Sequence, residues 1–148
     1  MNVEAVIKTD KQIPLKSRTI IHMILVYNKI NEQLTKALKP YDVSIQQFNV
    51  LRILRGRKGE PANLSTLNER MITKMSNTTR LVDKLLNKGF VERIVCESNR
   101  RKVEISLTPK GENILLKMDR LIKNTENELV RDFTREELEN LNSLLNKF

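Results

Sequence analysis

Three consecutive cations, Arg100, Arg101 and Lys102, stand at the head of a short run in which apolar and polar side chains alternate. The run covers residues 103–107 and reads VEISL. Such alternation is typical of a half-buried β-strand, so the cations are expected at or just before its start, on an exposed turn. Three positive charges crowded on one turn indicate an anionic ligand.

A second set of polar side chains lies in the stretch 76–87, whose periodicity is helical. One face of that helix carries Thr78, Leu81, Val82, Leu85 and Leu86. The opposite face carries Ser76, Asn77, Arg80, Lys84 and Asn87. Arginine and amide side chains read the edges of DNA bases through paired hydrogen bonds, and small side chains permit close approach. An ordinary solvated helix face has a similar composition, so this pattern alone leaves both interpretations open.

The elements that must position these side chains are two short helices and a β-hairpin. The first helix is expected to start at Asn63 or Ser65, and the second to follow Thr73. Gly89 stands where a left-handed C-cap would end the second helix. Strands are predicted over 90–95 and 102–107. This is the order of a winged helix-turn-helix, whose hairpin can reach backbone phosphates or the neighbouring minor groove.

Two helices are predicted before this module. The first runs from about Lys16 to Leu38, between Pro14 and Pro40, with apolar side chains at helical spacing. The next has Ser44 as its N-cap and stops before the basic loop formed by residues 56–59.

Two further helices are predicted after it. Thr108 followed by Pro109 is a strong start signal for a helix that continues to about Arg131. Thr134 and Glu137 form a capping box for a last helix. The flanking helices carry more apolar surface than the small module can cover, and a two-fold dimer is the simplest way to bury it.

The charge of the 148-residue chain is concentrated in its middle. Residues 1–50 carry a net charge of +3, residues 51–111 carry +8, and residues 112–148 carry −2. A localised positive field suggests a localised anionic partner, with nucleic acid ahead of an anionic membrane surface. A basic face kept for solubility is the plainer alternative.

Several fragments in succession identify a family. The runs MSNTTRLVDKLLNKGFVER and RRKVEISLTPKG, and within them RLVDKL, KGFVER and LTPKG, resemble the MarR family of bacterial transcriptional regulators. The resemblance covers nearly the whole chain. It implies one mainly α-helical domain with a small β-hairpin over 1–148, a winged helix-turn-helix flanked by N- and C-terminal dimerisation helices. The DNA-binding portion is expected over 41–108, and the dimerisation helices over 16–38 and 109–148.

The resemblance also implies what the site residues do. It places Ser76, Asn77, Thr79 and Arg80 where the recognition helix enters the major groove, and Lys84 belongs to the same polar face. Arg101 falls on the wing arginine that enters the minor groove, with Arg100 and Lys102 nearer to phosphate.

The wing departs from the family pattern at one position. The family pattern is Asp-x-Arg, but Asn99 occupies the aspartate position, and an amide cannot neutralise a neighbouring arginine. Glu97 or Asp83 could supply the missing acid. The turn over residues 71–74 also lacks the glycine that many such turns contain.

The remaining reactive side chains suggest no catalytic centre. Cys96 is the single cysteine, either an inert thiol or an oxidant sensor whose thiolate Arg100 and Arg101 would favour. His22 is the single histidine, which is too few for a zinc site or a nucleophilic triad. Without a glycine-rich phosphate loop either, we expect no enzyme, no metal and no cofactor.

An effector is a further implication of the family. Relatives bind small amphipathic anions, often phenolic, between the dimerisation helices and the winged helix. Side chains that could line such a space are His22, Met23, Tyr27 and Phe48. Side chains of this kind at helical spacing are also typical of a plain core.

The sequence therefore predicts a homodimeric regulator that binds a pseudo-palindromic double-stranded DNA operator, usually to repress, and that a small molecule can release. The alternatives are a non-specific architectural or RNA-binding winged helix, and a protein-interaction module. The first residues lack the apolar run of a signal peptide, and residues 19–27 are too short to span a bilayer. We expect a cytoplasmic protein with no membrane partner.

Overall fold

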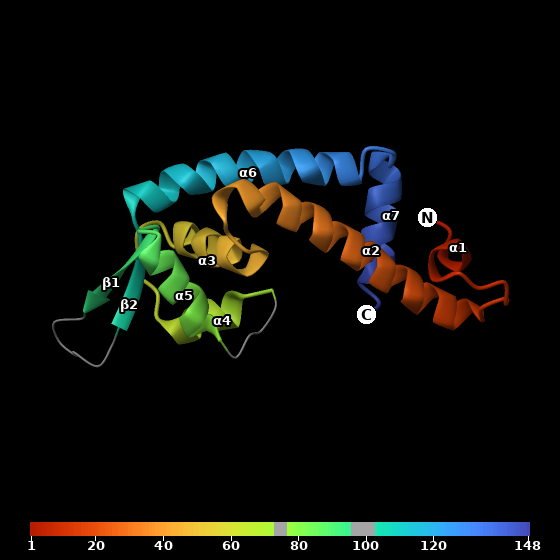
Figure 1. The fold of residues 1–148 in the computed structure, drawn as a ribbon, viewed down its shortest axis with the longest axis horizontal. Coiled ribbons are helices and arrows are strands. Elements are labelled where there is room, and N and C mark those ends of the chain that lie inside the picture. Colours follow the sequence, from red (N-terminus) through yellow and green to blue (C-terminus); the bar gives the residue numbers. More distant parts are fainter. Residues whose placement is uncertain (73–76, 96–102) are drawn as a thin grey trace. The chain divides into compact units, whose positions relative to one another are not determined.

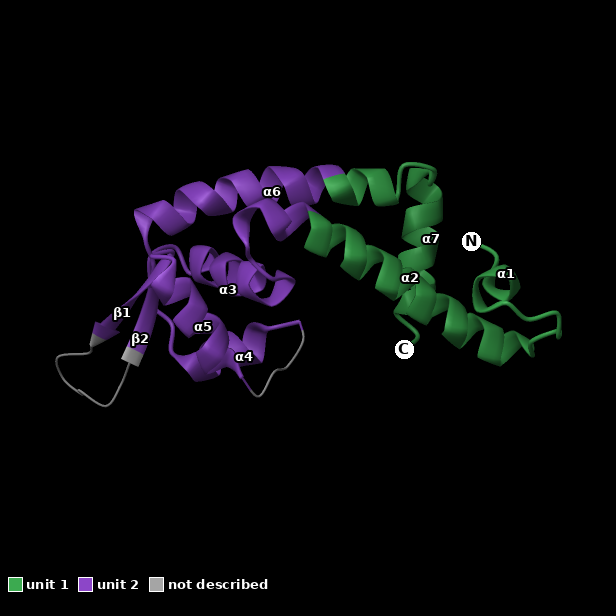
Figure 2. Ribbon diagram, viewed as in Figure 1, with its two compact units in different colours: residues 1–36, 125–148 green, residues 37–124 purple. Residues whose placement is uncertain are grey.

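A computed structural model describes residues 1–72, 77–95 and 103–148, which form helices and one two-stranded sheet (Figure 1). Two compact units are distinguished in Figure 2. The central unit consists of residues 37–124, and the terminal unit consists of residues 1–36 and 125–148. The mainly helical fold with a small hairpin confirms the predicted fold class.

Helices α3 and α4 of the central unit begin at residues whose side chains cap them, whereas α5 begins after Asn77 without a side-chain cap hydrogen bond. Helix α3 (Ile45–Gly56) starts at the predicted N-cap Ser44, which also exchanges hydrogen bonds with Gln47 in a capping box. Helix α4 (Leu64–Arg70) starts at Asn63, whose side chain accepts a hydrogen bond from the Thr66 amide. Helix α5 is Thr78–Asn87. The core that these helices share contains Phe48, Leu51, Leu54, Leu67, Val82 and Leu85.

The hairpin pairs β1 (Val91–Val95) with β2 (Val103–Leu107) in an antiparallel register. Gly89 precedes it with φ +68°, the left-handed conformation that the sequence predicted. Ala62 extends the pairing, because its amide and carbonyl form backbone hydrogen bonds of 2.9 and 2.8 Å with Ile105. The outer edge of β2 is therefore covered where it meets the core.

Helix α6 (Pro109–Leu129) starts at the predicted Thr108–Pro109 pair. The Thr108 hydroxyl accepts a hydrogen bond from the Gly111 amide at 3.0 Å and donates one to the Gly89 carbonyl at 2.8 Å. One hydroxyl thus joins the end of α5 to the start of α6. The α6 side chains buried in the central unit are Leu115, Met118 and Ile122.

The terminal unit contains α1 (Val3–Ile7), most of α2 (Leu15–Leu38) and α7 (Arg135–Leu145). The capping box predicted for α7 is present. Helix α1 was not predicted. The Arg18 guanidinium holds the Glu4 carboxylate through two hydrogen bonds of 2.7 and 3.1 Å, which lowers the pKa of Glu4.

Large apolar side chains of the terminal unit are exposed along α2 and near the C-terminus. Each of the following is at least 38 % exposed: Leu15, Ile20, Ile24, Tyr27, Ile30, Leu141, Leu144, Leu145 and Phe148. A soluble monomer rarely leaves so many large apolar side chains uncovered. No helix within the described ranges is both long and apolar enough to cross a membrane.

Candidate nucleic-acid interface

Helix α5 has one buried face and one polar, exposed face. Thr78, Val82 and Leu85 are buried, and the side chains facing solvent are Asn77, Thr79, Arg80, Lys84 and Asn87. The helix begins at Thr78, four residues later than the earliest start that the sequence allowed. Ser76, also named as a site residue, lies outside the described residues.

The cations of this face differ from their neighbours in what they contact. Lys88 Nζ lies 2.6 Å from the Asp42 carboxylate, and the Arg93 guanidinium lies 2.5 Å from that of Asp83. Arg80 and Lys84 form no ion pair with any residue in the described ranges. Their charges are therefore available to an external anion, as the donors of a base-reading helix must be.

The tip of the hairpin, residues 96–102, lies outside the described part of the chain. This covers the predicted wing cations Arg100, Arg101 and Lys102, and with them Cys96, Glu97 and Asn99. The described strands end at the pair formed by Val95 and Val103, so the hairpin that must carry the tip is in place. The other acid considered for the wing, Asp83, is engaged by Arg93 of β1.

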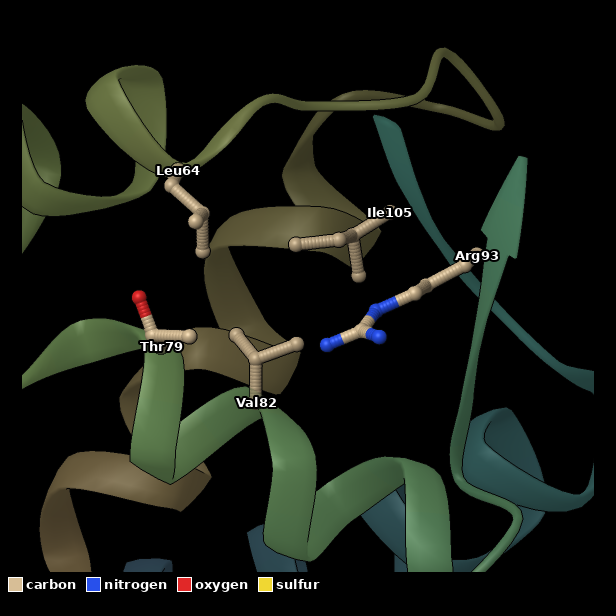
Figure 3. A pocket seen from close by; sticks show the side chains of 5 residues that line it. All are labelled: Leu64, Thr79, Val82, Arg93 and Ile105. Carbon is tan, nitrogen blue, oxygen red and sulfur yellow. The ribbon is translucent and has the colours of Figure 1, made fainter. Parts of the chain in front are cut away.

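A pocket of about 230 Å³ lies between α4, α5 and the hairpin (Figure 3). Its lining consists of Leu64, Thr79, Val82, Arg93 and Ile105. The walls are apolar except for the Thr79 hydroxyl and the Arg93 guanidinium, and Figure 3 shows the Arg93 side chain extending from β1 into the pocket. One terminal nitrogen of the Arg93 guanidinium is held by Asp83, so a small amphipathic anion in this apolar space would be bound by the remaining N–H donors of the guanidinium.

Sequence reasoning missed this pocket, because its residues come from four separate elements. Of the side chains proposed to line an effector space, Phe48 is buried in the core of the central unit. His22 and Met23 are half-buried in the terminal unit, where Tyr27 is 63 % exposed.

Metal-binding geometry is absent from the part of the chain that the structure describes. No group of three or more His, Cys, Asp or Glu side chains there is placed to hold a metal ion. The chemistry available on α5 is hydrogen bonding and charge.

The chain is similar to proteins of known role. Residues 43–103 match the profile of the MarR family. The multiple antibiotic resistance protein MarR of Escherichia coli (strain K12) is 31 % identical over 130 residues, covering 86 % of this chain and 87 % of that protein. The HTH-type transcriptional regulator PecS of Dickeya dadantii (strain 3937) is 31 % identical over 121 residues, covering 80 % of this chain and 72 % of that regulator.

The fold is also similar to that of a solved MarR structure. The crystal structure of a mutant MarR from E. coli complexed with operator DNA has a TM-score of 0.75 and 27 % sequence identity to this chain. The likeness covers 99 % of this chain and 98 % of that one.

Proposed function

This chain belongs to the MarR family, and from that premise we propose that it is a dimeric, sequence-specific DNA-binding regulator of transcription that represses through a pseudo-palindromic operator. The observation that carries the proposal is the amphipathic helix α5, which lies beside the hairpin and exposes Arg80 and Lys84. Neither cation forms an ion pair within the described residues, although the charge of Lys84 contributes to the lowered pKa of Asp42. The likeness to an operator-bound MarR favours this function over a non-specific or protein-binding one. We propose that the protein has no catalytic role and needs no cofactor. We also propose that it acts in the cytoplasm.

The DNA contacts divide between two elements. We assign the major groove to Ser76, Asn77, Thr79, Arg80 and Lys84. We assign the minor groove to Arg101, and the adjacent phosphates to Arg100 and Lys102. A helix in the major groove with an arginine in the flanking minor groove gives both base reading and recognition of groove shape. Residues 41–108 would supply this portion.

Dimerisation is assigned to residues 16–38 and 109–148. The exposed apolar side chains of α2 and α7 support this, since burial against a second copy removes them from water. Two recognition helices about one turn of DNA apart then match the symmetry of a pseudo-palindrome.

Selection from random duplex DNA tests the function. The full chain should enrich an inverted repeat whose half-sites are about 10 base pairs apart, centre to centre. Absence of any enriched motif would favour the non-specific alternative, and poor duplex affinity even at low salt would favour a protein-interaction module.

We predict that Arg101→Ala weakens operator binding and reduces the salt dependence of log K by about one unit per subunit, because one counterion-releasing contact is lost. The measurement is affinity for the selected operator by fluorescence anisotropy at four or more salt concentrations. Lys11→Ala removes an exposed cation that lies outside the segments assigned to DNA binding and dimerisation, and this control should leave the slope unchanged. An unchanged slope for Arg101→Ala would remove this residue from the interface.

We propose the pocket beside α5 as a site for an effector of the amphipathic-anion class. Thr79 belongs both to the pocket lining and to the exposed face of α5, so an occupant can alter DNA binding directly. Benzoate should therefore weaken operator binding, whereas benzamide, of similar shape but uncharged, should not.

Leu64→Phe is the pocket variant that checks this prediction. The larger phenylalanine side chain occupies part of the pocket, so benzoate can bind only by overpacking it, at a cost of about 1–3 kcal/mol in binding free energy. The benzoate concentration needed to release half of the operator should therefore rise by roughly 10-fold. Equal sensitivity of the variant and the wild type to benzoate would place the effector elsewhere.

A further inference from the structure

Arg93 is a charged side chain on the apolar face of the hairpin. In the antiparallel register it lies directly opposite Ile105, and Val91 lies on the same face two residues earlier. Val91 and Ile105 are only 2 % and 1 % exposed, so this face packs on the core of the central unit. The Arg93 stem runs along that apolar surface, and Figure 3 shows its guanidinium reaching toward Val82 of α5.

Asp83 forms an ion pair with that guanidinium. It is the only acidic residue of α5, and its Oδ1 lies 2.5 Å from the Arg93 terminal nitrogen. Asp83 follows Arg80 by three residues and Thr79 by four, so it lies close to the face assigned to DNA. A carboxylate at that place repels phosphate, which is an electrostatic disadvantage for a helix that lies in the major groove.

We infer that the Asp83–Arg93 ion pair is a positioning contact that fixes the hairpin on the recognition helix, so that the wing and α5 engage the DNA together. The inference rests on the proposed DNA-binding function. Between α5 and β1 the chain runs through only Lys88, Gly89 and Phe90, and this pair is a direct side-chain link across that turn. Asn99 is neutral, so under this inference the acid that orients the hairpin is Asp83 of α5, paired with the middle residue of β1.

A positioning role for Asp83 and a purely electrostatic role predict opposite changes in operator affinity for one substitution. Asp83→Asn removes a negative charge near DNA, and charge alone would tighten binding. If the pair positions the wing, the same change weakens specific binding. We expect a roughly 2- to 30-fold loss of operator affinity, the range for an exposed ion pair present once in each of two subunits. Affinity for unrelated duplex should stay equal or rise.

Glu92→Gln is the matched control. Glu92 is an exposed acid of the same strand that forms no ion pair within the described residues, and its alternation places it on the opposite face from Arg93. Glu92→Gln changes the net charge by the same amount as Asp83→Asn, so the operator affinity of this control should be unchanged or higher than that of the wild type. Opposite effects of the two variants separate positioning from charge.

A charge-exchanged pair supplies a second, charge-neutral test. Arg93→Asp alone should bind the operator poorly, and adding Asp83→Arg should recover at least part of that loss, because the ion pair is restored with reversed polarity. Hydroxyl-radical footprinting on the selected operator reports wing placement. Minor-groove protection beside each half-site should fade in Asp83→Asn and return in the exchanged pair.

The outcomes decide between the two proposals. If the wild type selects an operator but Asp83→Asn binds it as tightly as Glu92→Gln does, the positioning role is overturned and the DNA-binding function stands. If the wild type selects no operator, the proposed function itself fails. Should Asp83→Asn not fold, the exchanged pair decides: recovery over Arg93→Asp supports the inference, and no recovery overturns it.

Discussion

Arg80→Ala should lower affinity for the selected operator by about 30-fold or more and should relax base preference at one position of each half-site. An arginine that reads a base through two hydrogen bonds contributes about 1–3 kcal/mol of discrimination, and the operator complex contains two copies. The Arg80 side chain is exposed on α5 and has no acidic partner in the described ranges, so its loss leaves no buried charge behind. The fold should be unaffected.

The measurement is a repeat of the selection with the variant, together with anisotropy titrations on the wild-type operator. Lys11→Ala removes one exposed cation outside the segments assigned to DNA binding and dimerisation, and it is the control for net charge. It should retain both affinity and motif. A variant Arg80→Ala that selects the wild-type motif with undiminished affinity would contradict the placement of α5 in the major groove.

Gly111→Ala should destabilise the fold by about 3 kcal/mol or more, beyond the usual range for overpacking. A Cβ at this position would lie 2.0 Å from the Phe90 carbonyl oxygen and 2.9 Å from a Leu107 methyl. The first contact is with backbone, which cannot rotate away, so α6 would have to separate from the start of the hairpin. The Thr108 hydrogen bonds to Gly89 and Gly111 would be strained with it.

Urea unfolding followed by circular dichroism measures the change. Gly56→Ala is the matched control, because nothing lies within 4 Å of a Cβ there and the residue ends a helix. It should be neutral or stabilise by up to about 1 kcal/mol. Equal stability of Gly111→Ala and the wild type would show that α6 does not approach Phe90 so closely.

The helix starts could be predicted because their signals are local. Ser44 with Gln47, and Thr134 with Glu137, cap helices through contacts three residues apart. The same locality explains why Gly89 was placed correctly. Helix α1 gave no such signal, because it is five residues long and the contact that holds it joins Glu4 to Arg18, fourteen residues away.

The site was predictable only in part for the same reason. The polar face of α5 follows from helical periodicity, so Asn77, Arg80 and Lys84 could be named in advance. The pocket and the Asp83–Arg93 pair depend on how α5 packs against β1, which one-dimensional patterns do not contain. Asp83 was named as a candidate acid for the wing, but its partner in β1 was not foreseen.

We propose that two copies of this chain read the two half-sites of one operator. Sedimentation equilibrium of the chain with the selected duplex, and with the same duplex after one half-site is scrambled, tests it most directly. We expect two chains per intact duplex and a loss of most specific affinity on scrambling, since each mismatched base pair costs about 1–3 kcal/mol. One chain per duplex, bound equally well to the scrambled DNA, would contradict it.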